Sequence, residues 1–118
     1  MRYINALLCA LLGLFAIVQY NDPDALLWAL IYGVPAVWAG LAAWRPVGLS
    51  RSPAALGALA ACLLLALGGT IYMWPADFSV WWDVEEVRED IGLMIVTVTL
   101  LIVILTLWRS RRASEARA

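Results

Sequence analysis

The sequence predicts an all-α membrane protein, a bundle of four transmembrane helices with both termini in the cytoplasm. Of its 118 residues, 64% are hydrophobic and only 14% are charged, whereas soluble domains average about 45–50% and about 25%. A water-soluble fold of this length could not bury so much apolar surface. Four stretches with few charges, each close to the roughly 20 residues that cross a bilayer, fill most of the chain.

The first two spans are expected over residues 3–20 and 23–44. Asp22-Pro23 predicts the start of the second span, because aspartate caps helices and proline is tolerated at the first helical position. A proline inside this span predicts a kink. Small residues at about four-residue spacing mark the faces on which membrane helices pack. In the second span these residues are Ala29, Gly33, Ala36 and Gly40.

The third and fourth spans are expected over residues 53–74 and 84–108. Ser52-Pro53 repeats the pattern of a cap followed by proline. The uncharged part of the fourth span begins only at Ile91. We therefore expect its acidic start to stand in the headgroup layer or in water. Residues 109–118 are expected to form a disordered, basic cytoplasmic tail that contacts anionic lipid.

The arginines predict the orientation of the chain. In a four-span arrangement one side carries eight acidic residues and only Arg88, while the opposite side carries Glu115 as its only acid. The other seven arginines lie on that second side: Arg2, Arg45, Arg51, Arg109, Arg111, Arg112 and Arg117. Short arginine-rich segments stay in the cytoplasm. We expect both termini inside and the acidic loops outside a plasma membrane of the bacterial inner-membrane type.

The composition excludes several chemistries. The chain has no histidine, and all eight of its basic residues are arginine, so it has no lysine. Histidine-ligated haem, zinc–histidine sites, Ser-His and Cys-His catalysis and lysine Schiff bases are therefore excluded. We expect membrane lipids as partners, with a second membrane protein or a second copy of the chain as further candidates, and no nucleic acid.

Two polar segments fall on the outer side. The first is the turn of residues 19–24, and the second is the acidic start of the fourth span, residues 85–90. At 100° per residue, Glu85, Arg88 and Glu89 share one stripe with Gly92, and we expect this stripe to point over the bundle axis. On the opposite side of the helix, and expected to be solvated, lie Asp83, Glu86 and Asp90.

The two segments supply one set of candidate binding residues: Gln19, Asn21, Asp22, Asp24, Glu85, Arg88 and Glu89. One interpretation is that they only cap helices and close a turn. Another is a site for Ca²⁺ or Mg²⁺, since both ions prefer oxygen ligands. Its ligands would be Asp22, Asp24, Glu85 and Glu89. A third is that Arg88, held by a glutamate, binds an anionic group.

At these segments the sequence resembles the transmembrane protein 220 family, small four-span membrane proteins of bacteria and eukaryotes. The resemblance rests on residues 19–24 (QYNDPD), on Trp28 and Tyr32 at helical spacing after them, and on residues 85–89 (EEVRE) with Gly92. It implies the same fold and marks the same two segments. It implies no activity, because none is established for the family.

Three classes of function follow. The first is a non-enzymatic membrane protein whose acidic extracytoplasmic pocket binds a cation, a lipid headgroup or a partner protein. The second is a membrane enzyme in which Glu85 and Glu89, with Asp22 or Asp24, act as general acid and base on a lipid-like substrate. The third is a small dimeric transporter, which the position of the acids outside the uncharged cores disfavours.

Overall fold

The computed structural model describes residues 1–74 and 85–117, and every element in these residues is a helix. Asp83 lies outside the described residues, as does the side chain of Glu86. The helices, in chain order, are α1 (Arg2–Ile17), the 3₁₀ helix η1 (Val18–Asn21), α2 (Ala25–Trp44), α3 (Pro46–Ser50), α4 (Pro53–Tyr72) and α5 (Glu85–Arg117).

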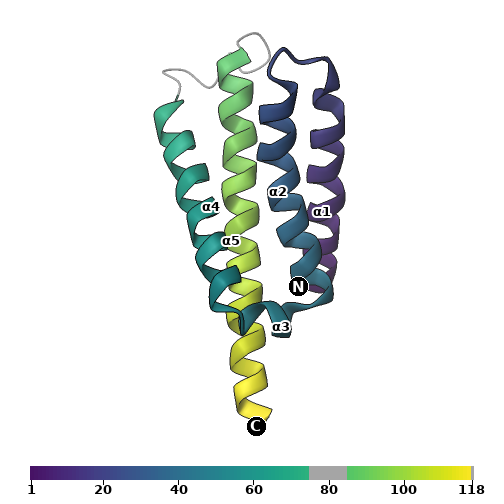
Figure 1. Ribbon diagram of the computed structural model, residues 1–118, viewed down its shortest axis with the longest axis vertical. Coiled ribbons are helices and arrows are strands. Elements are labelled where there is room, and N and C mark those ends of the chain that lie inside the picture. The colour runs from purple at the N-terminus through teal and green to yellow at the C-terminus, as the bar shows by residue number, and fades with distance from the viewer. Residues whose placement is uncertain (75–84, 118) are drawn as a thin grey trace.

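Four long helices stand side by side, and both chain termini lie at the same end of the bundle (Figure 1). The short helix α3 crosses that end between α2 and α4. Helix α5 contacts α1, α2, α3 and α4, while α1 packs mainly against α2. Within the described residues four helices are long and apolar enough to cross a membrane. The predicted all-α, four-span membrane fold is confirmed.

The bundle begins its second span slightly later than expected. Asp22 has an extended backbone (ψ 141°), and its Oδ1 accepts a hydrogen bond of 2.8 Å from the amide of Asp24. This local turn delays α2, which starts at Ala25 with Asp24 as its N-cap residue. The start of α4 at Pro53 matches the expectation, and the hydroxyl of Ser52 accepts the amide of Ala55 at 3.2 Å.

The prediction of a disordered tail is wrong, because α5 continues without a break from residue 108 to Arg117. Residues 109–117 contain neither glycine nor proline, so nothing in them ends a helix. Arg111 and Glu115 form an exposed ion pair of 3.3 Å one turn apart, worth a few tenths of a kcal/mol. At 33 residues, α5 is about 50 Å long. It therefore projects beyond a hydrocarbon core of about 30 Å.

The core follows α5. Its apolar side chains Val96, Leu100, Val103 and Leu107 are at most 3% exposed and pack with residues of α1, α2 and α4. Two polar contacts join helices within it. The Asn5 side-chain amide of α1 donates to the Thr106 hydroxyl at 2.7 Å, and the hydroxyls of Thr70 and Thr97 lie 3.4 Å apart.

The small residues of α2 do not all pack. A Cβ placed on Gly40 would lie 3.1 Å from Cys9 Sγ, so α1 and α2 approach closely there. Ala36 is 6% exposed and belongs to the core. Gly33, in contrast, has open space where a side chain would stand. Of the two glycines in this strip, only Gly40 therefore lies at a close contact with a neighbouring helix.

Candidate functional site

The turn between α1 and α2 is held by its own polar groups. The Gln19 amide in η1 donates to the carbonyl of Phe15 at 3.1 Å, which fixes the 3₁₀ turn on the end of α1. The Asp22 carboxylate accepts the amide of Asp24 through Oδ1. Since a carboxylate can accept several hydrogen bonds, Asp22 retains acceptor capacity for a ligand.

A pocket of about 200 Å³ lies where this turn meets the start of α5, at the end of the bundle away from the termini. Its lining residues come from η1, the turn, α2 and α5: Gln19, Asp22, Trp28, Tyr32, Glu85, Arg88 and Glu89. Five of the seven sequence candidates therefore meet around one space. Asn21 and Asp24 do not line it, and both are exposed.

Aromatic rings form the inner wall of this pocket. Trp28 and Tyr32, one turn apart on α2, have ring centroids 5.9 Å apart. Phe15 of α1 packs edge-on against Tyr32 at 5.4 Å. Trp28 is 6% and Tyr32 is 8% exposed. The binding residues predicted from the sequence did not include this wall. Its only signal was the helical spacing of Trp28 and Tyr32 after the polar turn.

Gly92 allows α2 and α5 to approach at the base of the pocket. A Cβ at this position would overlap the Tyr32 hydroxyl and would lie 3.0 Å from the Tyr32 Cζ atom. Position 92 therefore requires a residue without a side chain, whatever the role of the pocket. It also lies on the α5 stripe that carries Glu85, Arg88 and Glu89.

The pocket lining carries a negative excess, since Asp22, Glu85 and Glu89 face a single guanidinium, that of Arg88. Arg88 and Glu89 both take part in interactions of their own. Within residues 1–74 and 85–117, no three acidic or cysteine side chains are grouped so that they could hold a metal ion. The arrangement is therefore an acidic pocket with an aromatic wall.

The expectation that Asp90 is solvated is wrong. Its side chain is 0% exposed, and in the described part of the chain neither carboxylate oxygen has a hydrogen-bond partner. The prediction assumed that α5 has one buried face, but α5 is contacted by four other helices. Asp90 precedes Leu93 and Thr97, which contact Gly69 and Thr70 of α4. The α4 side of α5 is therefore buried as well.

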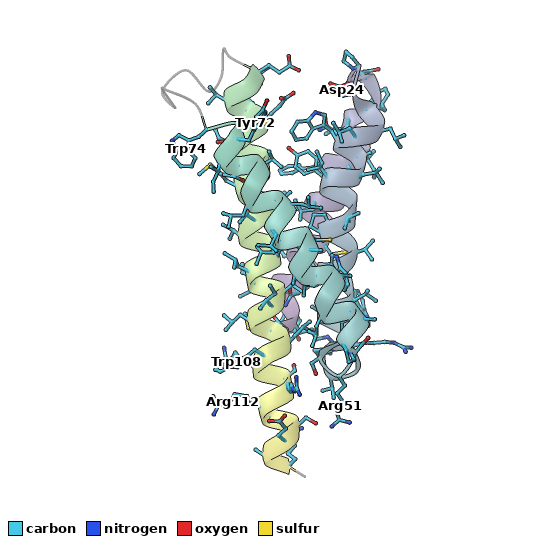
Figure 2. All side chains as sticks on the ribbon, turned by 60° about the vertical axis from the view of Figure 1, so that its left-hand side comes forward. Asp24, Arg51, Tyr72, Trp74, Trp108 and Arg112 are labelled. Carbon is cyan, nitrogen blue, oxygen red and sulfur yellow. The ribbon has the colours of Figure 1, made fainter. Side chains whose placement is uncertain are left out.

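The opposite end of the bundle is basic. A hollow of about 600 Å³ there is lined by residues that include Arg2, Thr106, Arg109 and Ser110. Figure 2 places Arg51 and Arg112 at this end, and Asp24 at the other. The guanidinium of Arg112 lies over the ring of Trp108, 5.0 Å from its centroid. The two ends of the bundle thus carry opposite charge.

Comparison with known proteins agrees with this fold. The family model described as "Transmembrane family 220, helix" matches residues 11–105, which include the whole pocket lining. A protein of the frog Xenopus laevis named Transmembrane protein 220 is 31% identical over 112 residues and covers 86% of this chain. The chain spans only 56% of that protein's length. No solved structure matches the chain.

Proposed function

The chain belongs to transmembrane family 220, and from this premise we propose that it is a non-enzymatic integral membrane protein that binds the ammonium group of a ligand. The binding site is the acidic pocket between the turn and the start of α5. The ligand is a small organic cation or a lipid headgroup, two sources that present the same ammonium chemistry.

The observation that carries this proposal is the joint lining of one pocket by three carboxylates and two aromatic side chains. Carboxylates attract a cation, and the faces of tryptophan and tyrosine stabilise an alkylammonium by about 0.5–2 kcal/mol. Trp28 and Tyr32 are almost fully buried, so their rings are fixed before a ligand arrives. Side chains that are already ordered reduce the entropy lost on binding.

The same features favour an alkylammonium over Ca²⁺ or Mg²⁺. Ca²⁺ takes six to eight oxygen ligands at close distance, and no three acidic side chains of the described residues are grouped in that way. An aromatic wall adds nothing to the binding of such an ion. A divalent cation held by Asp22, Glu85 and Glu89 is an alternative outcome of the test below.

We also propose that the pocket opens outside the cytoplasm. The end that carries it is acidic, whereas Arg51, Arg109 and Arg112 lie at the end where both termini lie. Arginine in segments near membrane helices is retained on the cytoplasmic side. Both termini are then cytoplasmic, and the pocket faces the outer surface of a plasma membrane.

One observation favours a second candidate, a small dimeric transporter. Asp90 lies on α5 directly before the uncharged part of that membrane helix, which begins at Ile91, and it is fully buried. A buried acid within a membrane helix is expensive and commonly marks an ion or proton pathway. The transporter candidate is supported if proteoliposomes of the parent take up a solute along with an ion or a proton, and if Asp90→Asn abolishes this uptake while the fold stays intact.

The test of the binding proposal is ligand-dependent thermal unfolding of the purified chain in detergent. Tetramethylammonium and choline are expected to raise the melting temperature, because a ligand at 100 times its Kd stabilises by about 2.7 kcal/mol. The same concentration of Na⁺ is the control for ionic strength. Stabilisation by Ca²⁺ or Mg²⁺ alone overturns the assignment to an ammonium ligand.

Two conservative variants separate the pocket from general surface charge. Asp22→Asn keeps an oxygen acceptor for the turn but removes a charge from the pocket lining, so the response to tetramethylammonium is expected to fall. Asp24→Asn removes a charge two residues away, outside the lining, and is expected to respond like the parent. Equal losses in both variants, or no response in any of them, contradict the proposal.

A further inference from the structure

An apolar groove of about 420 Å³ runs beside the pocket, between α2 and α4, with α5 as its floor. Its walls are Ile31 and Pro35 of α2 and Cys62 and Gly69 of α4, and its floor includes Leu93. Volumes of this size hold small ligands. Cys62, Gly69 and other small residues of α4 line the groove, and their side chains are too short to fill the space between α2 and α4.

The groove opens sideways toward the bilayer. Leu27, Leu30 and Leu65 belong to its lining and are 56%, 54% and 77% exposed. These residues lie within helices long and apolar enough to span the membrane. A hydrocarbon chain can therefore enter the groove directly from the lipid phase.

Trp28 lines both the polar pocket and the apolar groove, and so the two spaces adjoin at its indole ring. On α5 the change from one to the other takes a single turn, from Glu89 in the pocket to Leu93 in the groove. Four residues correspond to about 6 Å along a helix axis. A polar space thus lies directly above an apolar one, which is the profile of an amphiphile.

We propose that the two spaces together hold one membrane lipid with an ammonium headgroup, its headgroup in the acidic pocket and one acyl chain in the groove. The inference rests on the proposed function and adds that the ligand comes from the bilayer. Charge selects the headgroup: three carboxylates repel a purely anionic lipid. For a zwitterionic lipid, the guanidinium of Arg88 complements the phosphate.

The test compares lipids that share their acyl chains and differ in the headgroup. Delipidated protein in detergent is mixed with phosphatidylethanolamine or with phosphatidylglycerol, and retained lipid is counted by native mass spectrometry. Phosphatidylethanolamine is expected to bind about tenfold more tightly, which corresponds to about 1.4 kcal/mol. Asp22→Asn is expected to remove most of this preference, and Asp24→Asn to keep it. Equal retention of both lipids overturns the inference.

A substitution in the groove separates the two proposals. Cys62→Trp fills the groove and is expected to reduce retention of phosphatidylethanolamine about tenfold while leaving stabilisation by tetramethylammonium unchanged. Leu64→Trp, at a neighbouring α4 position outside the groove lining, is the matched control. If tetramethylammonium binds but Cys62→Trp retains lipid like the control, the lipid inference fails and the ammonium site stands. If tetramethylammonium has no effect, the proposed function fails.

A measurement without any substitution guards against misfolding of the tryptophan variants. A phosphatidylethanolamine with a photoreactive acyl chain is incorporated into vesicles of phosphatidylethanolamine and phosphatidylglycerol together with the wild-type chain. Crosslinks are expected in residues 27–35 of α2 and in residues 62–73, which belong to α4 and its C-cap; both segments form the walls of the groove. Crosslinks spread equally over exposed leucines of α1, such as Leu7 and Leu14, show ordinary lipid contact and overturn the inference.

Discussion

Gly92→Ala is the smallest change that should deform the pocket. The new Cβ would overlap the Tyr32 hydroxyl and lie 3.0 Å from its Cζ atom. Tyr32 cannot yield easily, because Phe15 packs against its ring and the side chain is 8% exposed. Overpacking of this kind costs about 1–3 kcal/mol. Replacing a mid-helix glycine by alanine stabilises the helix by up to about 1 kcal/mol, which offsets part of this cost. The expected net loss is about 1 kcal/mol, the middle of the range of about 0–2 kcal/mol that remains after this offset.

The measurement is the unfolding free energy in mixed detergent, together with tetramethylammonium binding. Gly68→Ala on α4 is the matched control, because a Cβ there meets nothing within 4 Å; it is expected to be neutral or stabilising. Tyr32→Phe removes the overlapping hydroxyl, so the double variant Gly92→Ala/Tyr32→Phe is expected to recover part of the loss. Contacting residues show coupling of about 0.5–3 kcal/mol in such a cycle. If Gly92→Ala behaves like Gly68→Ala in both measurements, the contact between Tyr32 and Gly92 is refuted.

Three further predictions concern packing, the buried acid and topology. Gly40→Leu forces a side chain into Cys9 and is expected to destabilise the protein by about 1–3 kcal/mol. Gly33→Leu places its side chain in open space and is expected to have the melting temperature of the parent. If the Gly40→Leu and Gly33→Leu variants have equal melting temperatures, the close contact between Gly40 and Cys9 is refuted. Asp90→Leu removes a buried carboxylate that has no hydrogen-bond partner in the described residues. The variant is therefore expected to raise the unfolding free energy by about 1–3 kcal/mol. A lower unfolding free energy would show instead that the Asp90 carboxylate makes a stabilising contact. In a cysteine-free background, an impermeant thiol reagent outside intact cells is expected to label Asn21→Cys but not Ser110→Cys; the reverse pattern overturns the orientation.

The four spans were predictable because the bilayer imposes its own length on any helix that crosses it. A hydrocarbon core of about 30 Å needs about 20 apolar residues, and this pattern is visible in the sequence without tertiary information. The exact residues at which the helices begin and end were harder to predict. The start of α2 follows a turn that is closed by a side-chain hydrogen bond from the Asp24 amide to Asp22 and by a backbone hydrogen bond from the Ala25 amide to the Asp22 carbonyl. The continuation of α5 depends on the absence of any residue that would stop it.

The pocket could be predicted in part. Helical periodicity placed Glu85, Arg88 and Glu89 on one stripe, and the structure brings them together with Gln19 and Asp22. Periodicity cannot tell how many neighbours a helix has, and for this reason it misplaced Asp90 on the central helix. It also cannot distinguish an aromatic pair that lines a cavity from one that fills a core. The role of Trp28 and Tyr32 required the packing of α1 and α5 around them.

Three features that lower stability lie in the half of the bundle that carries the pocket. Asp90, which has no hydrogen-bond partner among the described residues, the groove beside Cys62 and Gly69, and the helical glycine at position 92 all lie in that half. Each lowers stability relative to a filled apolar core. The other half holds the buried side chains of Val103 and Leu107 on α5 and a hydrogen bond from Asn5 of α1 to that helix. It also contains the hollow of about 600 Å³ and an Asn5 oxygen that has no hydrogen-bond partner in the described part of the chain.

Natural proteins depart from good packing mainly where a site requires it. A filled groove between α2 and α4 would make a more stable bundle, and leucine at position 90 would remove a desolvation cost. Both the groove and the Asp90 carboxylate lie within one helical turn of the pocket, since Glu89 lines the pocket and Leu93 lines the groove. Asp90→Leu is therefore the sharper test of function when stability and lipid retention are measured on the same sample. A gain in stability together with a loss of phosphatidylethanolamine retention identifies a residue kept for binding, whereas a gain in stability with unchanged retention separates Asp90 from the lipid site.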